Sequence, residues 1–194
     1  MSERAVLQLI KEIRGCRVCA EVLPLEPRPI LAARASARIL IAGQAPGREV
    51  HLSGVPWRDA SGDRLREWLG IEVERFYDPA QVALVPTGFC YPGSGRNGDL
   101  PPRPECRGLW HPRLLPLLES VELTILVGEH AQRHHLGDQY RGSVTATVQA
   151  WSSFTGIIPL PHPSPRNRGW LRRNPYFAEE LLPQVRARIA RLLG

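Results

Sequence analysis

The chain has 194 residues, 43% of them hydrophobic, which suits one globular domain over residues 1–194 and excludes a disordered chain. No apolar run is long enough to span a bilayer, and the charged segment Met1–Arg14 is no secretory signal, so we expect a cytoplasmic protein without membrane contacts. The net charge is +6 and Lys11 is the only lysine, so arginine carries the excess. Arginine suits phosphate, which favours a nucleic-acid partner, although genome composition would explain the arginine usage as well.

Apolar periodicity predicts helices that alternate with strands. A first helix begins after Ser2, its expected N-cap, and ends near Gly15. Four short apolar runs predict buried strands, at Ile39–Ala42, Val82–Val85, Leu123–Val127 and Ile157–Leu160. Helical patterns cover Asp63–Leu69, about Pro104–Leu118, Glu129–Leu136 and Ala178–Leu193. This alternation predicts an α/β fold in which helices cover both faces of a parallel sheet.

A glycine-rich, polar or histidine-bearing segment follows each predicted strand. In chain order these segments are Gly43–Gly47 (GQAPG), Pro86–Gly93 (PTGFCYPG), Gly128–Glu129 and Pro161–Asn167 (PHPSPRN). Ligands of open parallel sheets bind beyond the carboxyl ends of the strands. The sequence therefore predicts one site at one edge of the sheet.

The four cysteines read as ligands of a metal or cluster rather than as disulfides, because an intracellular compartment is reducing. Cys16 and Cys19 form a C-x-x-C pair, and Cys90 and Cys106 enclose fifteen residues. Thiolate sets of this kind suit both zinc and a [4Fe–4S] cluster, and the spacing does not separate the two.

Several of these motifs resemble those of the iron–sulfur (family 4) uracil-DNA glycosylases. The motif GQAPG is followed by Gly54-Val-Pro-Trp57 and then by Ser61-Gly62, and the cysteine spacing matches as well. The segment HPSPRN, with Trp170 after it, is similar to the second motif of the single-strand-selective uracil-DNA glycosylases. The resemblance covers about residues 16–170 and implies a three-layer α/β/α sandwich with a central four-stranded parallel sheet.

The resemblance also implies a function and a set of roles. It implies a monomeric, monofunctional DNA glycosylase that flips a deaminated base, uracil by default, out of DNA and hydrolyses its bond to the sugar, with a structural [4Fe–4S] cluster on the four cysteines. His162 would donate a hydrogen bond to the departing base, and Trp57 would stack on it. Further residues expected to bind the substrate are Gly43, Ala45, Gly47, Phe89, Ser164, Arg166 and Asn167.

Departures from the family pattern leave the chemistry open. Gln44 stands where family 4 has glutamate, and Pro86 stands where it has a base-reading asparagine. We therefore expect catalytic help from Gln44, His51 or Glu49, with Asp59 a further candidate for the general base. Two alternatives remain: a glycosylase for a deaminated purine such as hypoxanthine, and a lesion-binding protein that has lost catalysis.

Overall fold

The computed structural model describes residues 3–96 and 98–194, and its centre is a sheet of four parallel strands in the order β2-β1-β5-β6. The strands are β1 (Ile39–Ala42), β2 (Val82–Leu84), β5 (Leu123–Val127) and β6 (Ile157–Leu160). Three of the four predicted strands are confirmed residue for residue, and β2 ends one residue earlier than predicted. Pro159 lacks an N–H and is tolerated in β6 because β6 is an edge strand.

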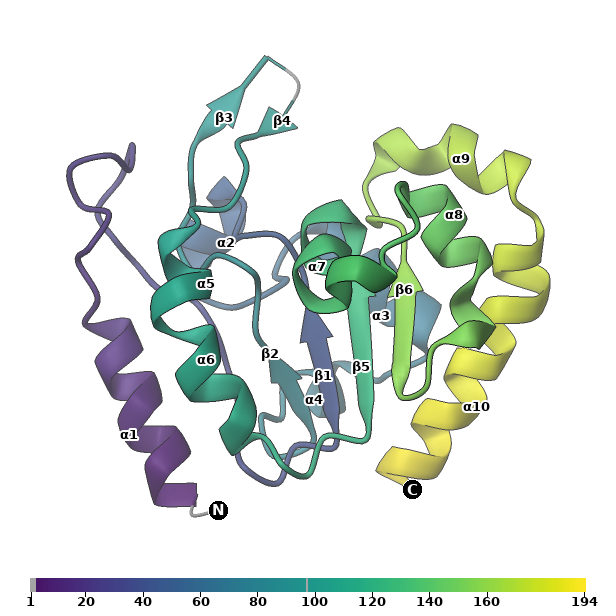
Figure 1. Cartoon of the computed structure of the whole chain (residues 1–194), viewed down its shortest axis with the longest axis horizontal. Coiled ribbons are helices and arrows are strands. Elements are labelled where there is room, and N and C mark those ends of the chain that lie inside the picture. The colour runs from purple at the N-terminus through teal and green to yellow at the C-terminus, as the bar shows by residue number, and fades with distance from the viewer. Residues whose placement is uncertain (1–2, 97) are drawn as a thin grey trace.

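Helices cover both faces of this sheet, so the predicted three-layer α/β/α sandwich is confirmed (Figure 1). Side chains alternate along β1: Ile39 and Ile41 join one core, whereas Leu40 joins the other. The first core includes residues of α3 (Ala60–Leu69) and α10 (Leu182–Leu193). The second core includes residues of α1 (Glu3–Arg14) and α6 (His111–Leu114). A third, smaller core lies under α7 (Gly128–Leu136).

The helix α3 begins three residues earlier than predicted, and two other predicted helices have a different internal structure. The segment expected to be one helix is divided into α5 (Glu105–Leu109), α6 and the 3-10 turn Leu115–Leu117, because Pro112 cannot donate a backbone hydrogen bond inside a helix. The last predicted helix is a π-helical stretch, Phe177–Leu181, that continues into α10. Ser2, the expected N-cap of α1, lies outside the described residues.

Several short elements were not predicted from the sequence. They are the helices α2 (Arg48–Ser53), α4 (Val73–Phe76), α8 (Val144–Gln149) and α9 (Arg168–Arg173), the 3-10 turns Gly137–Gln139, Trp151–Ser153 and Pro165–Asn167, and the strands β3 (Ser94–Gly95) and β4 (Gly98–Asp99). The two strands form an antiparallel hairpin that projects from the same end of the molecule as the carboxyl ends of the sheet strands (Figure 1). Over the described residues, no helix has the length and apolar character needed to cross a bilayer.

Candidate functional site

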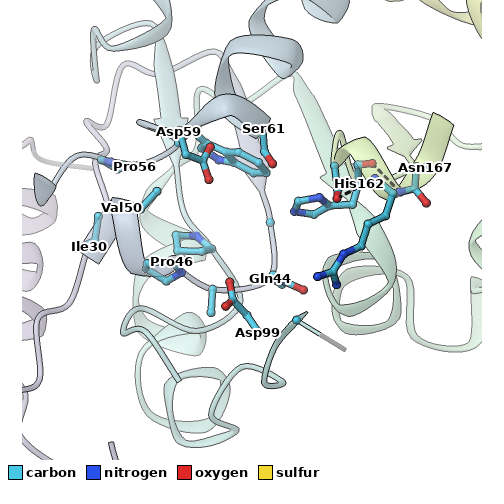
Figure 2. A pocket seen from close by; sticks show the side chains of 18 residues that line it. Ile30, Gln44, Pro46, Val50, Pro56, Asp59, Ser61, Asp99, His162 and Asn167 are labelled. Carbon is cyan, nitrogen blue, oxygen red and sulfur yellow. Dashed lines mark hydrogen bonds between the residues drawn. The ribbon is translucent and has the colours of Figure 1, made fainter. Parts of the chain in front are cut away.

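A cavity of about 450 Å³ opens at the carboxyl edge of the sheet, where the sequence predicts the site; we call it the edge pocket. It brings together ten residues that the sequence analysis selected for catalysis or substrate binding: Gly43, Gln44, Ala45, Gly47, Trp57, Asp59, His162, Ser164, Arg166 and Asn167. They come from the loop after β1, the segment before α3 and the loop after β6 (Figure 2). Segments far apart in the chain therefore converge on one hollow.

Trp57 forms one wall of the edge pocket in an unusual backbone conformation. Its φ of 57° is in the left-handed region, where it is the one non-glycine residue among those described. The carbonyl of Trp57 accepts a hydrogen bond from the hydroxyl of Tyr77 at 3.1 Å. A methyl group at Gly43 would lie only 2.6 Å from Cζ2 of Trp57, and one at Gly62 would collide with the Trp57 carbonyl. Two glycines thus make room for the ring and for its backbone.

His162 faces Trp57 across the pocket, with ring centroids 6.0 Å apart and ring planes tilted by 34°. Burial lowers the pKa of His162 from its usual 6.5, and the carboxylates of Asp59 and Asp99 partly oppose that shift. The imidazole is therefore neutral at pH 7, and it has one N–H to donate.

The loop that carries His162 is held by its own polar side chains. The amide of Asn167 donates to the carbonyl of His162 at 2.7 Å, and the hydroxyl of Ser164 accepts from the backbone N–H of Arg166 at 3.3 Å. The Nη1 atom of Arg64 also donates to the carbonyl of Pro163, at 3.4 Å. Ser164 and Asn167 thus line the pocket and also fix the position of the histidine.

Two carboxylates line the edge pocket, and the sequence analysis missed one of them. Asp59 caps α3 by accepting from the backbone N–H of Gly62 at 2.8 Å. Asp99 is in β4, where its Oδ1 atom accepts from the hydroxyl of Ser94 at 2.9 Å. Figure 2 shows the two carboxylates on opposite sides of the pocket, Asp99 beside Gln44 and Pro46. The Asn97-Gly98 dipeptide is a strong hairpin signal that would have placed Asp99 at a loop end.

Three residues selected from the sequence lie outside the edge pocket. Glu49 is exposed on α2, and His51 is 8% exposed behind it, with its ring 6.1 Å from that of Tyr91. Val50, between them, lines the pocket, and neighbouring side chains on a helix point about 100° apart, so both flanking residues turn away. Phe89 is 1% exposed and lines a different cavity. None of the three lines the edge pocket, so its geometry does not support their expected roles at the site, which stay predictions.

That different cavity is lined by all four cysteines together with prolines and aromatic rings; we call it the cysteine cavity. The backbone N–H of Phe89 points at Sγ of Cys106, 3.5 Å away. Burial raises the pKa of Cys90 to about 12 and that of Cys106 to about 11, with a further rise from neighbouring cysteines. The other residues that line the cysteine cavity are Pro27, Pro29, Phe89, Arg103 and Trp110. The cysteine cavity shares no lining residue with the edge pocket.

The family model described as the Uracil DNA glycosylase superfamily matches residues 32–186, a range that includes the whole sheet and every residue of the edge pocket except Ile30.

Proposed function

The chain belongs to the uracil DNA glycosylase superfamily, and on that premise we propose that it excises a deaminated base, uracil by default, from DNA. Membership makes it a DNA glycosylase, a hydrolase whose substrate is DNA. The observation that carries the finer proposal is the edge pocket itself, in which an aromatic wall, a neutral histidine and two carboxylates surround one hollow. Its volume of about 450 Å³ is within the range of small-molecule pockets and is ample for one nucleobase.

Base flipping supplies the ligand of this pocket, since a base inside a duplex is out of reach. A base sandwiched between two rings would need about 7 Å between them, twice the contact distance of about 3.5 Å. Trp57 and His162 are 6.0 Å apart and tilted, so they do not act as two parallel plates. We infer that Trp57 stacks on the face of the base and that His162 approaches its edge.

The leaving base carries negative charge as its bond to the sugar breaks, and we assign to His162 the role of the hydrogen-bond donor that stabilises this charge. A neutral imidazole donates through one N–H, and this hydrogen bond becomes stronger as the charge develops. Burial keeps the ring neutral at pH 7 because it lowers the pKa of His162. Protonation of the base beforehand is not needed in this scheme.

The two carboxylates of the edge pocket have different roles in this proposal. The sugar becomes cationic as the bond breaks, and negative charge on Asp59 and Asp99 stabilises it. The side chain of Asp59 is committed to capping α3, whereas Asp99 is exposed at the end of the hairpin. We therefore assign Asp99 the activation of the attacking water, in place of Glu49 and His51. Arg166, exposed at the rim, suits contact with a DNA phosphate.

We propose that the cysteine cavity, which is lined by all four cysteines, holds an iron–sulfur cluster, because the spacing of the cysteines resembles that of family 4. The backbone N–H groups of Phe89 and Arg28 point at the sulfurs of Cys106 and Cys90, as suits thiolate ligands. Cys16, Cys19, Cys90 and Cys106 would hold a [4Fe–4S] cluster. Its contribution would be to crosslink the segment after α1 to the loop after β2 and to α5.

A deaminated purine is a second candidate substrate, and Pro86 favours it. Pro86 lines the edge pocket at the position where family 4 has its base-reading asparagine, and it has no side-chain amide to recognise a pyrimidine edge. Hypoxanthine would then be read by Gln44, whose amide both donates and accepts.

The test is a panel of single- and double-stranded oligonucleotides that carry uracil, hypoxanthine or xanthine, incubated with the purified protein and then treated with alkali. Alkali-sensitive breaks at uracil support the proposal, and breaks at hypoxanthine alone support the second candidate. Strands that break before alkali treatment would contradict the monofunctional assignment, which Lys11 as the only lysine supports. Lesion binding without an abasic product would overturn catalysis and leave a lesion-binding protein.

A further inference from the structure

Three histidines outside both cavities gather at one point between α6 and α7. His111 is the first residue of α6, and His134 and His135 are neighbours in α7. One ring nitrogen from each lies within 4.8 Å of the other two. The ring of His134 is 4.8 Å from that of His111 and 4.8 Å from that of His135, between centroids. The function proposed above does not use this group, so the inference drawn here goes beyond it.

Hydrogen bonding fixes the tautomer of His111. Its Nε2 atom lies 3.1 Å from the carbonyl of Pro86, which can only accept, so Nε2 carries the proton. The Nδ1 atom of His111 therefore carries a lone pair and accepts a hydrogen bond from Nε2 of His134 at 3.0 Å, a bond that a metal ion held by both nitrogens would replace. A metal-ligating histidine typically has this arrangement, in which the second ring nitrogen donates to a backbone carbonyl.

His135 shows that hydrogen bonding alone does not satisfy the group. Its Nε2 atom is buried and has no hydrogen-bond partner. An unsatisfied buried polar atom destabilises a fold, so a partner for this nitrogen would stabilise it. Burial also lowers the pKa of all three histidines, to about 4 for His111 and about 3 for His135. The rings are neutral at pH 7, which is the form that binds metal.

We propose that His111, His134 and His135 bind one divalent transition-metal ion, zinc. Around a tetrahedral zinc with Zn–N of about 2.05 Å, the nitrogens lie about 3.4 Å apart. The separation of 3.0 Å between His111 and His134 and the 4.8 Å limit on the whole group bracket that value. Imidazole is a preferred ligand of zinc, and three histidines leave a fourth position for water.

The position of this site gives the metal a structural task. It ties α6 to α7, and it holds His111 in the tautomer that donates to the carbonyl of Pro86. Pro86 lines the edge pocket, and Phe89, whose ring stacks on His111 at 5.3 Å, lines the cysteine cavity. The zinc site therefore lies between the two cavities and braces the loop after β2 that serves both.

The test measures metal content rather than base excision, so its outcome is independent of the proposed function. The protein as purified is dialysed first against zinc chloride and then against metal-free buffer, and zinc and iron are counted by mass spectrometry. We expect one zinc per chain in the wild type and in His130→Ala, a matched control on α7 outside the group. His134→Ala should lose the zinc and keep the iron, because its side chain is only half-buried and the fold should tolerate the change.

A second measurement, the Tm with and without zinc, distinguishes a variant that has lost the zinc site from one that folds poorly. Zinc at 100-fold excess over its dissociation constant should raise the Tm of the wild type by roughly 5–10 °C and leave that of His134→Ala and of His135→Gln unchanged. Equal zinc content in the wild type and in both variants would place the metal elsewhere and overturn the proposal. Absence of zinc from the wild type after dialysis would overturn it as well.

Discussion

The edge pocket and the cysteine cavity share the loop after β2, yet their walls are of different kinds. Pro86 lines the first, and three residues later Phe89 lines the second. The edge pocket encloses about 450 Å³ and presents two carboxylates, an imidazole and a guanidinium. The walls of the cysteine cavity are mainly rings, prolines and sulfur. A site that binds and releases its ligand needs polar groups that water can solvate while the site is empty. A site that holds its ligand permanently can be closed and largely apolar.

The largest expected effect falls on the cysteine cavity. Cys106→Ala removes one of the four proposed ligands, and structural metal centres contribute of the order of 10 kcal/mol to folding. We expect loss of iron, aggregation on expression and a Tm at least ~10 °C lower. Thermal melts and iron analysis check this, and Cys90→Ala should behave in the same way. If the Cys106→Ala protein kept the wild-type iron content and Tm, the cysteine cavity would not be a structural metal site, and the contrast drawn between the two cavities would be wrong.

A change in the edge pocket should act on rate and leave the fold intact. His162→Ala should slow single-turnover base excision by about 10²–10³-fold, the scale for losing one preorganised donor to a developing negative charge. Binding to uncleavable lesion DNA should change little, because the interaction is strongest in the transition state. Glu49→Gln, exposed outside the pocket, is the control and should keep the wild-type rate. Equal losses of rate and binding in His162→Ala would make the histidine a positioning residue.

The two carboxylates of the edge pocket can be separated by isosteric amides. Asp99→Asn should lower the single-turnover rate by about 10²-fold, as expected for loss of a general base. Asp59→Asn removes the charge but keeps the cap of α3, because asparagine caps helices as well as aspartate does. Its rate should fall less, by about tenfold, as befits electrostatic help without proton transfer. The reverse order of the two losses would move the general base to Asp59.

Gly43 offers a way to move Trp57 without replacing it. The added methyl of Gly43→Ala would lie 2.6 Å from Cζ2 of Trp57, so the indole must shift. Loss of base stacking is worth about 1–3 kcal/mol, and we expect capture of the flipped base to weaken by about 5–150-fold. Fluorescence of a 2-aminopurine next to the lesion reports this capture. Gly108→Ala, where a methyl group meets no atom within 4 Å, is the control. Unchanged capture in Gly43→Ala would show that the ring is not the stacking surface.

The smallest expected effect is a flat pH profile. Burial lowers the pKa of His162 below 6.5, so the midpoint of its protonation lies below pH 6.5. The single-turnover rate should therefore not change through titration of His162 as the pH falls from 8 to 6.5. Rates measured over this range for the wild type and His162→Gln give the test. A wild-type transition at or above pH 6.5 that His162→Gln lacks would contradict a neutral, buried donor.

The sequence predicted the sheet and much of the site for a clear physical reason. Strands buried on both faces are continuous apolar runs, so their ends, and with them the loops that carry Gly43 and His162, can be located from the sequence. The direction in which a short helix turns its side chains is set by packing instead. On α2 the pocket residue is Val50, and the polar neighbours that chemistry suggested, Glu49 and His51, turn away.

Contacts between segments that are far apart in the chain could not be predicted from the sequence either, because packing sets them as well. His111 is separated from His134 and His135 by more than twenty residues and by β5, and no sequence pattern indicates that the three meet. Asp99 was missed because a hairpin with two-residue strands has no apolar pattern. The break between α5 and α6 followed from Pro112, a signal present in the sequence that the apolar periodicity of residues 104–118 obscured.

The left-handed backbone of Trp57 bears on how this protein would evolve under heat. A non-glycine residue at a φ of 57° costs of the order of 1–3 kcal/mol, a strain that glycine at the same position would relieve. The indole also packs against the core to which α3 and α10 contribute, and removing an aromatic ring from a core costs about 3–5 kcal/mol, more than the strain that glycine would relieve. A laboratory selection for thermal tolerance alone should therefore retain Trp57, just as a selection that demands repair would.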